Sequence, residues 1–315
     1  MTLGANETAH LTTTDIIGKT GIDIADQDIV LYRIRRLFIM KKSIYIDFNI
    51  LTWYMNNKTE NENVGKCLEK IKKKYDIYCS PAHFEEIAKI EREMKERKIS
   101  KAVIRKHKRY LEELTNQNIV YIEPRTSYGK YVLKKNSGLF PQVYRDVIKK
   151  DGPNITRAVE TIDKKNLEFW KEKRATANDP NKSENKFLNA TLVSGISTKD
   201  IFESKAVAYI CEKTSWDDYK EKISPKLLKN IYEIDVKRPY HIFSLHIECA
   251  MKILNYCGYH SDTGNLESPT HDISHAIYGA KCDYFITRDK KLFFRLKAVY
   301  FWLGVPTKVF LCKGK

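Results

Sequence analysis

Short apolar runs alternate with amphipathic helical patterns at the start of this chain, and this alternation most constrains its fold. The first run, SIYIDFNIL at 43–51, is short and rich in Ile and Tyr, which is typical of a buried strand. A helical pattern at 61–75 precedes a second short run at 76–80, and Ser80 and Pro81 are then suited to begin another helix. Strand, helix, strand and helix in this order predict an α/β fold.

The same alternation returns at the other end of the chain. An amphipathic helical pattern at 241–259 ends near Gly258, and a second helix is predicted at 271–282. A strand predicted at 284–287 follows, and then another helix and a last strand at 307–311. Both ends of the chain therefore predict elements of one α/β sheet.

The middle of the chain has a different pattern. Residues 98–239 show helical patterns and polar loops without a repeat, and the segment is too long for a simple connection. We therefore predict an α/β domain formed by 40–97 and 240–315, with 98–239 as a long, mostly helical insertion. Residues 1–39 are rich in Thr and Asp and precede a Met that resembles a natural protein start, so we expect a poorly structured or dispensable extension.

Charge and cysteine usage restrict the partners and the compartment. The chain has 56 Lys and Arg against 40 Asp and Glu, a net charge of +16, which favours polyanions such as nucleic acid. No apolar run approaches the roughly 20 residues that span a bilayer, so no membrane partner is expected. The seven cysteines are scattered and form no CxxC pair, which is typical of a reduced, cytoplasmic protein.

Acidic residues fall at comparable places along the α/β pattern. Asp47 lies in the first apolar run, Glu85 and Glu86 lie in the helix after the second strand, Asp272 begins a late helix, and Asp289 follows a late strand. The carboxyl ends of parallel strands and the helix starts meet at one edge of such a sheet. Carboxylates that converge there repel one another unless a cation lies between them, and oxygen ligands of this kind suit Mg²⁺ or Mn²⁺.

Three motifs carry a resemblance to a known family: IYIDFN at 44–49, SPAHFEEIAKI at 80–90 and HDISHAIYGAKCDYFITRDKKL at 271–292. This ordered set resembles the PIN-domain metal-dependent ribonucleases over about residues 40–97 and 240–312, and the last motif is the most specific. The resemblance implies a PIN-like, Rossmann-like parallel sheet flanked by helices. It also implies a metal-dependent endoribonuclease. The long segment between the second and third acids departs from the family and leaves substrate choice and access open.

The resemblance also implies the roles of individual residues. The implied catalytic and metal-binding residues are Asp47, Glu86, Asp272 and Asp289, with Asn49 and Thr287 as supporting groups. The family pattern favours Glu86 because an apolar residue follows it, but Glu85 stays open, since both glutamates flank the apolar face of their helix. His83 is within a turn of the second acid and is expected to contact phosphate or to be a structural histidine.

Each acid also has an ordinary structural interpretation. Asp47 fits a buried ion pair, the two glutamates fit a solvated helix face, and Asp272 and Asp289 fit helix N-caps. Their order and spacing together favour a metal centre, in which a metal-bound water attacks a phosphodiester.

A basic run at 95–109 follows the second acid. It is expected to extend the same helix and to lead a phosphate backbone toward the centre, with salt-sensitive binding; a solvated helix face is the alternative. The implied nucleic-acid-binding residues are Lys95, Arg97, Lys98, Lys101, Arg105, Lys106, Lys108 and Arg109.

The sequence thus predicts an endoribonuclease that uses Mg²⁺ or Mn²⁺, with RNA as partner and single-stranded DNA still open. One alternative is a nucleic-acid-binding or toxin-like module, inactive on its own and held by an inhibitory protein partner or in a homo-oligomer. A weaker alternative is an HD-type metal phosphohydrolase built on His271 and Asp272 with His241 or His246.

Overall fold

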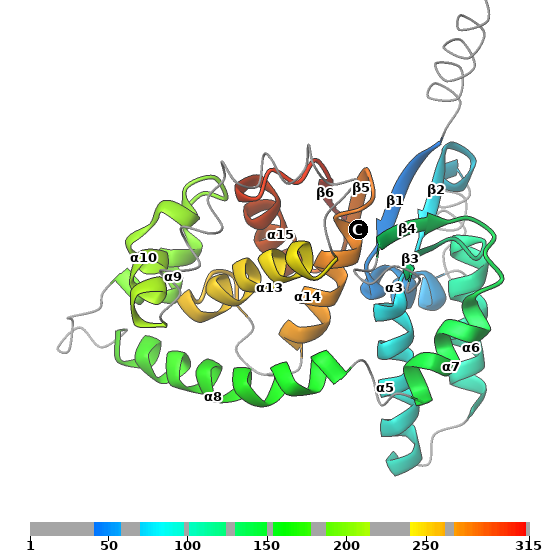
Figure 1. Ribbon diagram of the computed structural model, residues 1–315, viewed down its shortest axis with the longest axis horizontal. Helices are drawn as coiled ribbons and strands as arrows, with labels where there is room; N and C mark the ends of the chain where they lie inside the picture. The colour runs from blue at the N-terminus through cyan, green and yellow to red at the C-terminus, as the bar shows by residue number, and fades with distance from the viewer. Residues whose placement is uncertain are drawn as a thin grey trace, which may run out of the picture. The chain divides into compact units, whose positions relative to one another are not determined.

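A computed structural model of the chain describes residues 41–57, 70–97, 101–123, 130–149, 154–177, 187–214, 240–261 and 268–312 (Figure 1). Their helices and strands belong to one compact unit, Lys42–Lys315. The extension predicted at 1–39 and most of the helix predicted at 61–75 lie outside the described residues.

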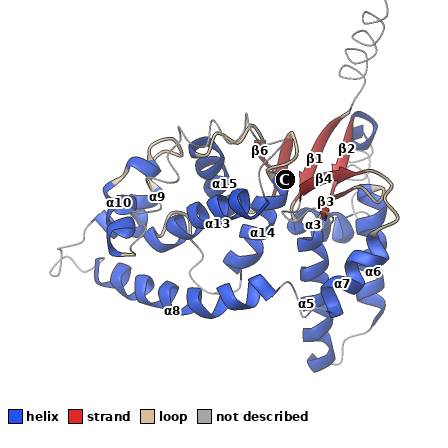
Figure 2. Ribbon diagram, viewed as in Figure 1, coloured by secondary structure: helices blue, strands red, loops and turns tan. Residues whose placement is uncertain are grey.

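The central feature of this unit is a four-stranded parallel sheet with the strand order β2-β1-β5-β6 (Figure 2). Its strands are β1 (Lys42–Ile46), β2 (Tyr75–Tyr78), β5 (Tyr284–Thr287) and β6 (Lys308–Leu311). β1 pairs with a strand more than two hundred residues away, as Tyr45 lies opposite Phe285. The α/β fold with a parallel sheet flanked by helices, predicted from the alternation at both ends of the chain, is confirmed.

Two hydrophobic cores cover the two faces of the sheet, because successive residues of β1 point to opposite sides. Ile44 and Ile46 belong to one core, whereas Tyr45 belongs to the other. The helices of the first core are α3 (Phe48–Asn57), α5 (Pro81–Arg97), α6 (Lys101–Thr115) and α7 (Phe140–Lys149). Those of the second are α8 (Asn154–Ala177), α9 (Ala190–Ser194), α10 (Lys205–Lys213), α13 (Tyr240–Cys257), α14 (Ser268–Gly279) and α15 (Lys290–Trp302), with a 3-10 turn at Ile201–Glu203.

The segment 98–239 contains α6 to α10 and also a β-hairpin that the sequence pattern does not predict. The hairpin pairs β3 (Ile119–Glu123) with β4 (Lys130–Lys134), each only five residues long. Its first strand begins beside the end of β2, since Val120 N donates to Cys79 O at 2.8 Å. Helices of this segment contribute to both cores, so it packs closely against the elements from the two ends of the chain.

The first strand is shorter than the sequence predicts. β1 ends at Ile46 and α3 begins at Phe48, so the prediction of a strand over 43–51 is wrong beyond Ile46. Apolar residues in this run fit helical spacing as well as strand spacing, and a short apolar run does not distinguish the two. The consequence is that Asp47 lies at the end of a strand rather than within it.

None of the described helices is both long enough and apolar enough to cross a bilayer. Six of the described cysteines are not in disulfide bonds, and burial raises the pKa of one of them, Cys257, to about 12. A thiol with so high a pKa is protonated near neutral pH, so it is a packing group rather than a nucleophile.

Candidate functional site

Asp47 lies at the carboxyl-terminal edge of the parallel sheet, and it is the most buried carboxylate among the described residues. It directly follows β1, its side chain is almost fully buried, and its own N–H donates to Ile286 O of the neighbouring strand at 3.0 Å. Its Oδ2 accepts from Asn49 Nδ2 at 3.1 Å and from Thr287 Oγ1 at 2.7 Å. The pairing of β1 with β5 thus places Asp47 beside the Thr-Arg-Asp turn.

This turn connects two of the predicted acids through one hydroxyl group. Thr287 is fully buried, and its Oγ1 donates to Asp47 and accepts from Asp289 N at 2.9 Å. Asp289 Oδ1 in turn accepts from Lys291 N and Leu292 N, so Asp289 is the N-cap of α15. The N-cap interpretation of Asp289 therefore holds, and the same residue also lies at the edge that carries Asp47.

Asp272 is placed differently from the prediction. α14 begins at Ser268, so Asp272 lies in the second turn of the helix and does not begin it; that prediction is wrong. The Ser-Pro pair at 268–269 suits a helix start, three residues before the position that the sequence pattern favours. Asp272 is buried, and its Oδ2 accepts from Arg295 Nη2 at 2.7 Å.

Arg295 is a buried cation beside the acids, and it is not among the residues predicted from the sequence. Its side chain is fully buried on α15, and its Nη1 donates to Asn255 Oδ1 of α13 at 2.6 Å. The sequence did contain a signal, because Arg295 lies three residues after Leu292 and four before Val299, on the buried stripe of α15. A buried charge needs a partner, and Asp272 is that partner.

Glu86 reaches the centre from α5 through a histidine. Its Oε1 lies 2.7 Å from Nε2 of the fully buried His275, whose Nδ1 lies 2.7 Å from the Tyr45 hydroxyl. Burial lowers the pKa of His275, but the hydrogen bond and charge of Glu86, with the charge of Asp47, outweigh burial and raise it. These contacts place Glu86 at the centre, and Glu85 is half-buried beside it on the same helix.

His83 has both ring nitrogens in use inside the protein. The ring is fully buried, Nδ1 accepts from Ser80 N at 3.2 Å, and Nε2 lies 2.9 Å from Ile46 O. Burial lowers the pKa of His83 well below its usual value. The geometry favours the structural interpretation, in which a neutral His83 joins the end of β1 to the start of α5.

The four acids act electrostatically on one another, and we call Asp47, Glu86, Asp272 and Asp289 the acidic centre. Burial raises the pKa of Asp47, and the charges of Glu86 and Asp289 add to the rise, whereas His275 and Thr287 oppose it. Burial raises the pKa of Asp272 to about 7, with further increases from Asp47 and Asp289 and an opposing effect of Arg295. Carboxylates from the first part and the last part of the chain therefore lie close enough to act on one another electrostatically.

The fit of this centre to a metal ion depends on how its acids are compensated. Among the described residues, no three His, Cys, Asp or Glu side chains converge on a common metal position. Asp272 and Glu86 pair with Arg295 and His275, whereas the hydrogen bonds of Asp47 and Asp289 come from neutral donors. Mg²⁺ usually binds through one or two carboxylates and keeps several waters, so Asp47 and Asp289 are a donor set that fits it.

The basic run does not form one extended helix. α5 ends at Arg97 and α6 begins at Lys101, so the prediction that the basic run extends the helix of the second acid is wrong. The run of basic residues includes Ser100, a residue type favoured at helix starts. Lys98 and the side chains of Lys95 and Arg97 lie outside the described residues.

α6 nevertheless presents a basic face. Lys101, Arg105, Lys106 and Arg109 are exposed there, while Lys108 is half-buried with its Nζ 3.1 Å from the centre of the Tyr144 ring. On the buried side of α6, the ring of His107 stacks on Phe48, the residue after Asp47. The described part of the basic run is therefore joined through α3 to the edge that carries the acidic centre.

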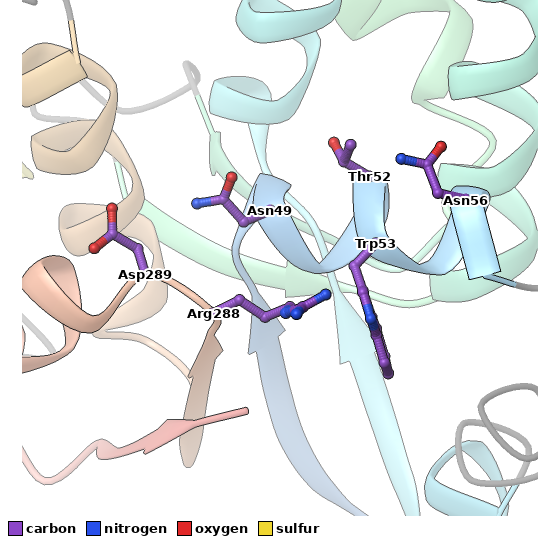
Figure 3. A pocket seen from close by; sticks show the side chains of 6 residues that line it. All are labelled: Asn49, Thr52, Trp53, Asn56, Arg288 and Asp289. Carbon is purple, nitrogen blue, oxygen red and sulfur yellow. The ribbon is translucent and has the colours of Figure 1, made fainter. Parts of the chain in front are cut away.

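A pocket of about 520 Å³ lies beside the acidic centre (Figure 3). We call it the α3 pocket, and its lining residues are Asn49, Thr52, Trp53, Asn56, Arg288 and Asp289. Asn49 also donates to Asp47, and Asp289 belongs to the centre itself, so pocket and centre share residues. Trp53 and Arg288 are not predicted from the sequence. The sequence pattern predicts a strand over 43–51 and not the helix that carries Trp53.

Comparison with protein-family models, with curated proteins and with solved structures finds no match to this chain.

Proposed function

We propose that this protein is a metal-dependent endonuclease of the PIN-like type, which hydrolyses phosphodiester bonds of RNA. The observation that supports this most is the buried Asp47, whose pKa is raised by burial and by its acidic neighbours at the carboxyl edge of a parallel sheet. Burying several like charges together is costly, and a divalent cation compensates it. The order of the acids in the motifs that resemble PIN-domain ribonucleases supports the same proposal.

In this proposal, each residue has a distinct task. Asp47 and Asp289 would hold Mg²⁺ or Mn²⁺. Thr287 connects the two residues, because its hydroxyl group donates to the Asp47 carboxylate and accepts from the backbone N–H of Asp289. Asn49 orients Asp47 by donating to its Oδ2. The bound ion supplies a water of lowered pKa and stabilises charge on the phosphodiester. Arg295 and His275 compensate Asp272 and Glu86, which keeps the remaining negative charge near Asp47 and Asp289.

The surface charge supports nucleic acid as the substrate. The net charge of +16 and the exposed basic residues of α6 attract a phosphate backbone. This binding should weaken as salt is added, because the entropy gained by releasing counterions from the phosphates becomes smaller. RNA is the substrate that the family resemblance favours, and single-stranded DNA is tested beside it. A cytoplasmic location, which the free cysteines fit, belongs to the same proposal.

The test is cleavage of a pool of structured and single-stranded RNA with Mn²⁺. Wild-type protein is compared with Asp47→Asn, with an EDTA control and with Asp200→Asn, which changes an exposed aspartate elsewhere. We expect metal-dependent cleavage that Asp47→Asn abolishes and Asp200→Asn preserves. Equal cleavage by Asp47→Asn and wild type would refute the assigned centre.

A binding-only or toxin-like module is the second candidate function. It is favoured by the pairing of Asp272 with Arg295 and of Glu86 with His275, which leaves no preformed group of three metal-binding side chains in the described chain. Calorimetric titration of Mn²⁺ separates the candidates: a nuclease binds the ion, and Asp47→Asn binds it more weakly. A wild-type protein that takes up no Mn²⁺ but binds RNA would support the module and a search for its protein partner.

A further inference from the structure

The outer face of α3 has an unusual composition. Asn49, Thr52, Trp53 and Asn56 follow the spacing i, i+3, i+4, i+7 and so share one face of the helix. The opposite side is buried in the first core through Phe48, Ile50, Leu51, Tyr54 and Met55. α3 contains no charged residue, although 30% of the chain is charged. This partly exposed stripe therefore combines amides, a hydroxyl group and a tryptophan without a charge, and Trp53 also packs against the first core.

The other wall of the α3 pocket comes from the Thr-Arg-Asp turn. Thr287 points inward to Asp47, and the next residue, Arg288, extends toward α3, as Figure 3 shows. The Arg288 guanidinium carbon lies 4.9 Å from the centre of the Trp53 ring. The amide of Asn49 extends toward the side on which Asp289 lies (Figure 3). An aromatic face, a cation and amide groups thus line one cavity beside the acidic centre.

We propose that the α3 pocket binds one unpaired nucleotide of the nucleic-acid strand, next to the phosphate that is cleaved. The base stacks on Trp53, the Arg288 guanidinium contacts the adjacent phosphate, and the amide of Asn49 faces the edge of the base. Aromatic rings bind unpaired bases of any sequence, arginine binds phosphate through two parallel donors, and amides pair with base edges. The cavity volume of about 520 Å³ is within the usual range for small-ligand sites.

The same geometry indicates whether the pocket binds single-stranded or double-stranded nucleic acid. A base inside a duplex is stacked on both faces and cannot lie on Trp53, so the pocket selects single-stranded segments. An acidic peptide would also pair with Arg288, but it would leave the amides and the indole face unused. The position relative to the cleaved phosphate rests on the proposed function, whereas the nucleotide site itself does not, because binding is measured without cleavage.

The experiment measures fluorescence anisotropy of labelled oligonucleotides in EDTA: single-stranded RNA, single-stranded DNA, an RNA duplex and an acidic peptide. Trp53→Ala removes the ring, and Trp53→Phe keeps an aromatic face. Asn56→Glu adds a negative charge at an exposed position where misfolding is not expected. Phe301→Ala is the matched control, because Phe301 is an exposed aromatic residue with a cation, Lys199, 5.9 Å from its ring centre.

We expect single-stranded RNA to bind about ten-fold or more weakly to Trp53→Ala, as for loss of one stacked base. Asn56→Glu should also weaken binding, Trp53→Phe should lie between wild type and Trp53→Ala, and Phe301→Ala should equal wild type. Wild-type affinity of Trp53→Ala would overturn the site, as would a duplex or a peptide that binds better than single strands.

Cleavage assays then separate the two proposals. If Asp47→Asn abolishes cleavage but Trp53→Ala cleaves and binds like wild type, the nucleotide site is wrong and the nuclease stands. If no variant or wild-type protein cleaves, yet binding depends on Trp53 and Asn56, the nucleotide site stands without the nuclease.

Discussion

At the scale of single residues, the acidic centre depends on how each carboxylate is compensated. Asp272 and Arg295 form an ion pair in which both side chains are buried, so each charge depends on the other for its stability. Removing one member of such a pair leaves a charge without compensation in a medium of low dielectric constant. Asp47, by contrast, accepts these side-chain hydrogen bonds from a threonine and an asparagine, neither of which carries a charge that compensates the carboxylate.

Arg295→Met should lower the free energy of unfolding by about 3–5 kcal/mol, because it leaves Asp272 buried without its cation. The double variant Arg295→Met with Asp272→Leu should recover much of this loss, since well-packed apolar groups replace a buried pair at little cost. Guanidinium denaturation curves of wild type and of the single and double variants at pH 8, above the pKa of about 7 that Asp272 has beside Arg295, measure both values. Unchanged stability of Arg295→Met would show that the pair contributes nothing.

The raised pKa of Asp272 predicts how stability changes with pH. Its pKa is 3.8 in the ordinary state and about 7 in the folded protein, so the folded chain keeps a proton that the unfolded chain has lost between these values. The contribution of this retained proton to the free energy of unfolding is complete below about pH 4. It is lost as pH rises toward 7, at up to roughly 1.4 kcal/mol per pH unit.

The difference in unfolding free energy between wild type and Asp272→Asn isolates this effect, because Asn cannot lose a proton in this range. Wild type should become less stable relative to Asp272→Asn as pH rises from 4.5 to 7, and the difference should be constant above about pH 7.5. Parallel pH profiles for the two proteins would contradict the raised pKa.

At the scale of elements, the turn from β5 to α15 combines a structural and a chemical task. Thr287, the last residue of β5, faces Asp47, whereas Arg288, in the bend that follows the strand, extends toward α3 (Figure 3). Asp289 then caps α15 with the carboxylate that borders the acidic centre. Capping and metal binding make different demands on this side chain, and substitutions separate them.

Asp289→Asn should leave the free energy of unfolding within about 0.5 kcal/mol of wild type, because Asn is as good an N-cap as Asp. Asp289→Ala should lower it by about 1 kcal/mol, since the N–H groups of Lys291 and Leu292 lose their acceptor. Both variants should lose Mn²⁺-dependent cleavage. A stable Asp289→Asn protein with full cleavage would leave Asp289 as a cap alone.

At the scale of the whole molecule, one compact unit joins elements from both ends and the middle of the chain. The parallel pairing of β1 with β5 sets the acidic centre, and helices on both sides complete the two cores. The excess of positive charge is a property of the entire chain, and it acts on a polyanion through released counterions. The exposed residues of α6 are expected to provide a localised share of this effect.

Changing Lys101, Arg105, Lys106 and Arg109 to Gln should reduce the salt dependence of single-stranded RNA binding, with the slope of log K against log salt falling by up to about 3. The matched control changes four exposed lysines elsewhere, Lys171, Lys199, Lys213 and Lys297, to Gln. Both proteins lose the same net charge, so an equal fall in slope would indicate a diffuse field rather than a binding face on α6.

The sequence by itself determined the features that depend on near neighbours along the chain. Alternating short and helical patterns predicted the α/β fold, Ser80 and Pro81 marked the start of α5, and Gly258, with φ +83°, marked the end of α13. The order of the acids and the spacing from Thr287 to Asp289 are equally local, because strand ends and helix caps are encoded within a few residues.

Only the tertiary structure decided which of these residues meet. The end of β1 at Ile46, the pairing of Asp272 with Arg295 and that of Glu86 with His275 arise from packing between elements far apart in sequence. The sequence shows that Arg295 lies on an apolar stripe, but it cannot show which carboxylate compensates it. Burial sets whether a charge is tolerated, and burial is a property of the packed cores rather than of any local pattern.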